Sequence, residues 1–182
     1  MRVFAQALSA IVRLLEDAKT HHLLEQYALI GGFAVSAWSV PRATHDVDFA
    51  LALGASDAAA LSRFLQAEFL PGEPDDPLRG VFRTSVSVGD QSIPVQLILM
   101  PPVWNAIVFQ DLESLSLSGC LLPVVSWRAL VLLKLYAGGP QDLLDAQQIL
   151  AVRQPTPDER HAVAALADKV GLAAAWQALL RP

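Results

Sequence analysis

The stretch that decides the fold spans residues 28–53 and reads ALIGGFAVSAWSVPRATHDVDFALAL. It begins inside a short apolar run, 27–30, which is too brief for a helix and predicts a buried strand. Two glycines, Gly31 and Gly32, follow at once, and residues 33–40 then show helical spacing until a proline ends them. This order predicts a strand, a tight glycine turn and a helix.

A second strand is predicted over residues 44–53 because apolar and polar side chains alternate there. Val47 and Phe49 fall on one side of this strand, while Asp46 and Asp48 fall on the other. Two carboxylates on one strand face repel each other, and burial strengthens the repulsion. A divalent cation bound between them relieves it, and oxygen ligands favour Mg²⁺ or Mn²⁺. The alternative is that both aspartates lie at the end of the strand and face water.

The glycine turn suggests that the cation binds together with phosphate groups. Gly31 and Gly32 lie before a predicted helix, where backbone N–H groups and the helix dipole favour phosphate oxygens. Ser36, one turn later, adds a hydroxyl to this phosphate site. Without the aspartates, the same pair of glycines is explained by a tight turn.

The remaining pattern predicts an α+β fold with a small mixed sheet flanked by helices and a helical C-terminal part. Residues 1–125 are expected to form the core, and residues 126–182 a helical subdomain packed on it. The further elements expected are a helix over 4–18, a helix after Ser56 or Asp57, an exposed loop at 71–80, a hairpin of 81–88 and 92–100, helices at 127–137 and 141–152, and helices from Thr156 to Leu180.

Composition excludes several classes of protein. The formal net charge is −5, and no run of five basic residues occurs, so a strong basic patch for nucleic acid is not expected. A single cysteine excludes an internal disulfide framework. The chain shows no signal peptide and no apolar run long enough to cross a bilayer, so we expect a cytoplasmic protein without a membrane partner.

Two motifs resemble a known family. The residues that carry the resemblance are Gly31-Gly32-x-Ala34, Arg42-x-Thr44-x-Asp46-x-Asp48, Ser126-x-x-x-Leu130-x-x-x-Lys134-x-x-Ala137 and Asp142-x-x-Asp145. Together they resemble the polymerase-β-like nucleotidyltransferase superfamily, and most closely its minimal bacterial branch of AbiEii-type toxins. The resemblance touches residues from about 28 to 150.

The resemblance implies transfer of a nucleoside monophosphate from a nucleoside triphosphate (NTP) to a hydroxyl, with Mg²⁺ or Mn²⁺ as cofactor. One cation would lower the pKa of the attacking hydroxyl, and a second would neutralise the departing pyrophosphate. The acceptor is left open among an RNA end, a protein and a small molecule. The branch also implies toxin activity with a cognate antitoxin as partner.

The resemblance assigns roles residue by residue. Asp46 and Asp48 would be the catalytic metal ligands, and Gln96 stands where the family has a third carboxylate. An amide oxygen can coordinate a metal, but it has no charge and cannot accept the proton of a hydroxyl. Either another acid, such as Asp90 or Asp142, supplies the missing group, or the protein binds nucleotide as a catalytically degenerate module.

The remaining assignments concern the nucleotide and the acceptor. Arg42, Thr44 and Lys134 would contact the nucleotide. The alternative for Arg42 is an exposed loop residue, and Lys134 is equally explained as a helix side chain that reaches solvent. Asp142 and Asp145 are either a helix cap and a solvated position, or residues of the substrate cleft.

Overall fold

The computed structural model describes residues 2–54, 56–73, 78–117 and 119–181. The strands in this part of the chain are β1 (Gln26–Leu29), β2 (Val47–Ala52), β3 (Glu68–Pro71), β4 (Gly80–Val88), β5 (Gln91–Leu99), β6 (Glu113–Leu117) and β7 (Cys120–Val124). They form one sheet in the order β3-β4-β5-β2-β1-β7-β6. The β2–β5 and β1–β7 pairs are parallel and the other pairs antiparallel, so the sheet is mixed, as predicted.

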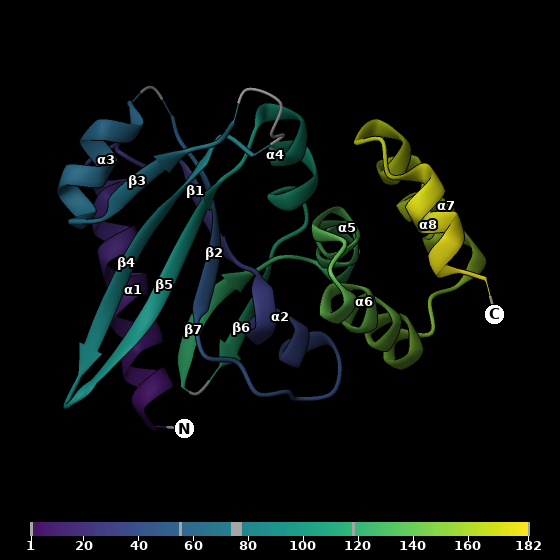
Figure 1. Ribbon diagram of the computed structural model, residues 1–182, viewed down its shortest axis with the longest axis horizontal. Helices are drawn as coiled ribbons and strands as arrows, with labels where there is room; N and C mark the ends of the chain where they lie inside the picture. Colours follow the sequence, from purple (N-terminus) through teal and green to yellow (C-terminus); the bar gives the residue numbers. More distant parts are fainter. Residues whose placement is uncertain (1, 55, 74–77, 118, 182) are drawn as a thin grey trace.

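Helices cover both faces of this sheet (Figure 1). They are α1 (Arg2–Thr20), α2 (Gly31–Trp38), α3 (Ala58–Leu65), α4 (Pro102–Val108), α5 (Trp127–Ala137), α6 (Pro140–Arg153), α7 (Pro157–Lys169) and α8 (Ala173–Leu179). Helix α1 packs on β4, β5 and α3, whereas α2 packs on β2 and contacts α5 and α6. Figure 1 shows α7 and α8 beyond α5 and α6, farthest from the sheet. No helix in the described ranges is long and apolar enough to span a membrane.

Several helix ends follow directly from local side-chain chemistry. The Asp57 carboxylate accepts from the Ala60 N–H and begins α3, and the Ser126 hydroxyl does the same for α5. Thr156 and Glu159 form the reciprocal capping box predicted for α7. These predicted starts are confirmed, and so is the β4–β5 hairpin.

The strand predicted over 44–53 begins later than expected, at Val47. The Thr44 hydroxyl donates to the Asp46 carboxylate Oδ1 at 3.0 Å, and this local bond holds the chain in a bend before β2. From Val47 onward the strand is buried between β1 and β5, and only Asp48 in it is partly exposed.

Four elements were not predicted: β3, α4, β6 and β7. Strand β3 includes Pro71 and β4 starts at Gly80, so both ends of the predicted 71–80 loop belong to strands. Residues 74–77 of that loop lie outside the described residues.

Candidate active site

A cavity of about 450 Å³, here called the aspartate cleft, lies between the sheet and α5. Its lining includes Gly31, Asp46, Asp48, Gln96, Lys134, Tyr136 and Asp142. These residues come from five parts of the chain: the start of α2, the region of β2, and β5, α5 and α6. The structure therefore brings both predicted metal-binding aspartates, Gln96 and one of the predicted glycines to one place.

Gly31 lies directly against Asp48. Its φ angle is +64°, and a Cβ atom added to it would overlap the Asp48 carboxylate. The backbone is tied there as well, because the Ile30 N–H donates to the Asp48 carbonyl at 2.9 Å. Only glycine lets the carboxylate approach the first turn of α2 so closely.

Gly32 makes a different contact, on the segment that leads into β2. An added Cβ would lie 2.6 Å from the Thr44 hydroxyl oxygen, so the chain there also needs a glycine. The Ser36 hydroxyl donates to the Gly32 carbonyl at 3.0 Å and accepts from the Arg42 N–H at 3.3 Å. Ser36, Arg42 and Thr44 line a neighbouring cavity of about 450 Å³ with Phe33, rather than the aspartate cleft.

The two cleft aspartates lack full compensation of their charge. Asp46 accepts from Thr44 and, at 3.4 Å, from the Gln96 side-chain amide. Burial, and next the nearby charge of Asp46, raise the pKa of Asp48 to about 6, although the positive charges of Lys134 and Arg42 act in the opposite direction. The pair therefore holds negative charge that the surrounding protein does not neutralise.

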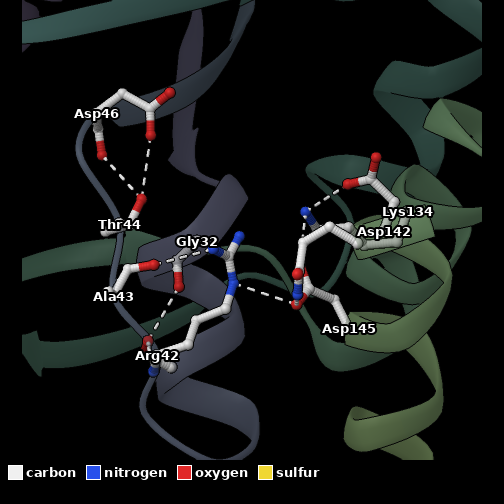
Figure 2. Close-up of polar contacts among 10 residues, drawn as sticks. Gly32, Arg42, Ala43, Thr44, Asp46, Lys134, Asp142 and Asp145 are labelled. Atoms are coloured by element: carbon white, nitrogen blue, oxygen red, sulfur yellow. Dashed lines mark hydrogen bonds and ion pairs between the residues drawn. The ribbon is translucent and has the colours of Figure 1, made fainter. Parts of the chain in front are cut away.

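A second pair of aspartates, on α6, has close cationic partners (Figure 2). Lys134 Nζ lies 2.7 Å from Asp142 Oδ1 and 2.9 Å from Asp145 Oδ2, and Arg42 Nε lies 3.1 Å from Asp145 Oδ1. The Arg42 contact is a close ion pair rather than an aligned hydrogen bond. Gln141 also donates to Asp145 at 2.9 Å.

This cluster corrects one sequence-based alternative. Asp145 is 0% exposed, so it is not a solvated position. It is also absent from the described residues that line the cleft. It is buried because Arg42 and Lys134 cover it from two other segments of the chain. Asp142, at the start of α6, does line the cleft.

The donor set fits a cation that is bound jointly by the protein and by phosphates. Among the described residues, no cluster of three or more His, Cys, Asp or Glu could hold a metal by itself. Mg²⁺ commonly takes one or two protein carboxylates and completes its shell with water and substrate phosphates. Asp46 and Asp48 fit that pattern, whereas a second cation would need a further carboxylate. Asp90 cannot supply it, because it lies at the exposed turn between β4 and β5.

The apolar wall of the cleft was not predicted. Helix α5 contributes Leu130, Leu133 and Ala137 beside Lys134, and the other wall includes Met100. A signal was present, since these four positions of α5 recur at the i, i+3, i+4, i+7 spacing of one helix face. Only the family resemblance, through Lys134, indicated that this face borders the aspartates; the helical spacing alone did not.

Comparisons with known proteins support the fold. No protein-family model matches the chain, and no curated protein sequence does so either. Among solved structures, an antigenic nucleotidyltransferase-like protein from Paracoccidioides brasiliensis is 16% identical, with a TM-score of 0.50 over 93% of this chain and 91% of that one. The antibiotic-resistance factor ANT(2'')-Ia gives the same identity and TM-score over 93% of this chain and 90% of its own. The chain thus has a nucleotidyltransferase-like fold. These matches do not show that it belongs to the branch of AbiEii-type toxins.

Proposed function

We propose that the protein is a metal-dependent nucleotidyltransferase that moves a nucleoside monophosphate from an NTP to a hydroxyl acceptor. The observation that carries this proposal is the meeting of Asp46, Asp48 and Gly31 at one cleft of a nucleotidyltransferase-like fold. The carboxylates supply a seat for one Mg²⁺ or Mn²⁺ ion, and the first turn of α2 supplies backbone N–H groups for phosphate oxygens.

In the proposed reaction, the acceptor hydroxyl oxygen attacks the α-phosphorus of the NTP. A new oxygen–phosphorus bond forms, and the bond from the α-phosphorus to the bridging oxygen of the β-phosphate breaks. Pyrophosphate leaves with that electron pair. The hydroxyl proton passes to solvent, because Gln96 has no basic atom in the place where a carboxylate is expected. When bound, the cation supplies positive charge to the triphosphate oxygens.

Lys134 is suited to hold the triphosphate. Its ammonium group has three donors, and Asp142 and Asp145 occupy two of these. The side chain lines the cleft, so the third donor can serve a phosphate oxygen. Arg42 acts indirectly in this proposal, because its Nε pairs with Asp145 and its guanidinium also holds the Ala43 carbonyl.

A second candidate function is nucleotide binding without transfer. Gln96 favours it, since the amide donates to Asp46 and brings no negative charge to the site. Such a protein would serve as a nucleotide-binding or protein-interaction module and would keep the cleft while lacking the chemistry.

A thermal-shift experiment tests the binding site that both candidates share. NTP with Mg²⁺ should raise the melting temperature of the wild type, whereas NTP with EDTA should not. Asp48→Asn should lose this effect, and Asp111→Asn, a surface aspartate outside the cleft, should keep it. An equal shift in Asp48→Asn would overturn the metal seat.

A transfer assay separates the two candidates. Wild type and Gln96→Asp are incubated with α-labelled NTP and an extract containing RNA, protein and small molecules, and labelled products are resolved. Labelling by the wild type that Asp48→Asn abolishes supports the enzyme. Labelling only by Gln96→Asp supports the binding module.

The setting of this activity rests on the sequence resemblance. We propose a cytoplasmic toxin whose activity a cognate antitoxin blocks. Induced expression in bacteria should arrest growth for the wild type and not for Asp48→Asn at equal protein level. Unimpaired growth with an actively labelling wild type would remove the toxin role and leave the enzyme.

A further inference from the structure

A second hollow extends from the aspartate cleft along the sheet. It has a volume of about 310 Å³ and shares Leu78, Gln96 and Ile98 with the cleft. The rest of its lining comes from the end of β3 and the start of β4: Leu70, Pro71, Gly72, Glu73, Gly80, Val81 and Arg83. We call it the β3–β4 hollow. Because the two cavities have Gln96 in common, a molecule in the hollow has one end beside the proposed reaction centre.

Strand register places the positively charged side chain of Arg83 in one row with Asp48 of the proposed metal site. Asp48 pairs with Gln96 across β2 and β5, and Gln96 pairs with Arg83 across β5 and β4. Directly paired residues share a sheet face, so the three side chains form one row on the cleft side. Neighbouring strands lie about 4.8 Å apart, which puts the Arg83 backbone about 10 Å from that of Asp48.

The Arg83 guanidinium has no carboxylate partner among the described residues. It is exposed, and it takes part in none of the ion pairs found there. Its register partner on β3 is Glu68, and Glu73 lines the hollow, but neither forms an ion pair with it. Arg42 and Arg128, by contrast, each pair with an aspartate. No carboxylate in the described ranges competes for its planar fork of five donors, so they can serve a ligand.

We propose that the β3–β4 hollow is the acceptor subsite and that Arg83 selects a small hydroxyl acceptor carrying a phosphate or carboxylate group. This inference rests on the proposed function. The acceptor's anionic group pairs with Arg83 while its hydroxyl lies over Gln96, toward Asp48. The volume suits a small molecule, and the chain's net charge of −5 without a basic run disfavours a polynucleotide.

Binding measurements test the subsite apart from catalysis. Calorimetric titrations use glycerol 3-phosphate, glycerate and uncharged glycerol, each with and without Mg²⁺ and a non-hydrolysable α,β-methylene ATP. Wild type should bind the two anions at least about tenfold more tightly than glycerol. Arg83→Ala should remove that preference, Arg83→Lys should restore part of it, and the charge-matched control Arg13→Ala should leave it intact. Comparing the two anions shows whether phosphate or carboxylate is preferred.

Three results would overturn the subsite: equal binding of glycerol and glycerol 3-phosphate by the wild type, anion binding that Arg83→Ala leaves unchanged, or transfer to RNA ends that is insensitive to Arg83→Ala. If the proposed function itself is wrong, a different experimental result is expected. In that case the ATP analogue does not bind with Mg²⁺, while the titrations without nucleotide still decide whether Arg83 holds the anion. Arg83→Ala should leave the thermal shift with Mg²⁺ and NTP unchanged, which shows that the metal seat is intact.

Discussion

The molecule has two pairs of aspartates, Asp46 with Asp48 and Asp142 with Asp145, and their surroundings differ. Asp46 and Asp48 have no ion pair among the described residues, and burial raises the pKa of Asp48. Asp142 and Asp145 lie within 2.9 Å of the Lys134 ammonium, and Asp145 also pairs with Arg42. Charge that the protein balances internally stabilises the packing of helices, whereas unbalanced charge beside a cavity is what a cation can bind. Function is therefore expected at the first pair, and structural support at the second.

The largest expected effect is a loss of stability when Lys134, the positively charged partner of Asp142 and Asp145, is replaced. Lys134→Met leaves Asp145 buried with Arg42 as its one cationic partner, and breaking such a buried pair should lower the free energy of unfolding by about 3–5 kcal/mol. Urea unfolding at neutral pH measures it. Arg128→Met breaks the solvent-exposed pair with Asp111 and should cost only about 0–1 kcal/mol. Equal losses in the two variants would mean that the α6 pair is no more important than a surface contact.

Removing the charge of Asp48, which has no ion-pair partner among the described residues, should instead raise the free energy of unfolding. The pKa of Asp48 rises from 3.8 in the unfolded chain to about 6 in the fold. Its ionisation therefore costs stability that is absent below pH 3.8, grows through this window and is complete above pH 6. Without metal, Asp48→Asn should stabilise the protein by up to about 3 kcal/mol at pH 8, and the gain should fade as the pH falls toward 4. Denaturant unfolding in EDTA at several pH values measures this, and a gain independent of pH would contradict it.

A smaller effect should follow from Gly31→Ala. The left-handed φ costs an alanine about 1–2 kcal/mol, and the methyl group also overlaps the Asp48 carboxylate. Gly89→Ala is the matched control, because its φ is +59° and nothing lies within 4 Å of the added carbon. Thermal unfolding of both variants isolates the contact with Asp48. If adding Asp48→Ala does not remove the difference between them, the proposed close approach is wrong.

The smallest expected effect concerns how Asp46 is held. Thr44→Val removes the hydroxyl that donates to its carboxylate, which should cost about 1 kcal/mol of stability and weaken the Mg²⁺-dependent shift with NTP. Thr20→Val removes a similar hydrogen bond at the exposed end of α1 and should leave that shift unchanged. An unaltered shift in both variants would show that Thr44 does not position Asp46.

Local chemistry explains which elements the sequence predicts. The hairpin turn at Gly89, the cap at Ser126 and the capping box at Thr156 each act within a few residues, so they could be recognised in the sequence alone. The strand at 113–117 does carry a local signal, since serines alternate with leucines, but it is only five residues long and was missed. The strand at 120–124 contains Pro123, which disfavours a strand. The pairing of Leu29 with Val124 joins distant segments and depends on tertiary context.

In the candidate site, too, residues with a local sequence signal could be predicted and residues that depend on long-range contacts could not. Asp46 and Asp48 could be identified because strand alternation and the nearby glycine turn are both local. The burial of Asp145 could not be, because it depends on Arg42, which lies far away in the sequence. The cation Arg83 was also missed, since its place beside Gln96 follows from strand register and not from spacing in the sequence.

The contact between Arg42 and Asp145 also bears on how the protein matures during synthesis. The sheet strands are all complete by Val124, so a ribosome releases the whole sheet before α6 emerges. The ion pair between Arg42 and Asp145 can form only once residue 145 has left the exit tunnel and folded. A chain made only as far as Val124 can therefore hold every strand of the described sheet while Arg42 still lacks its partner on α6.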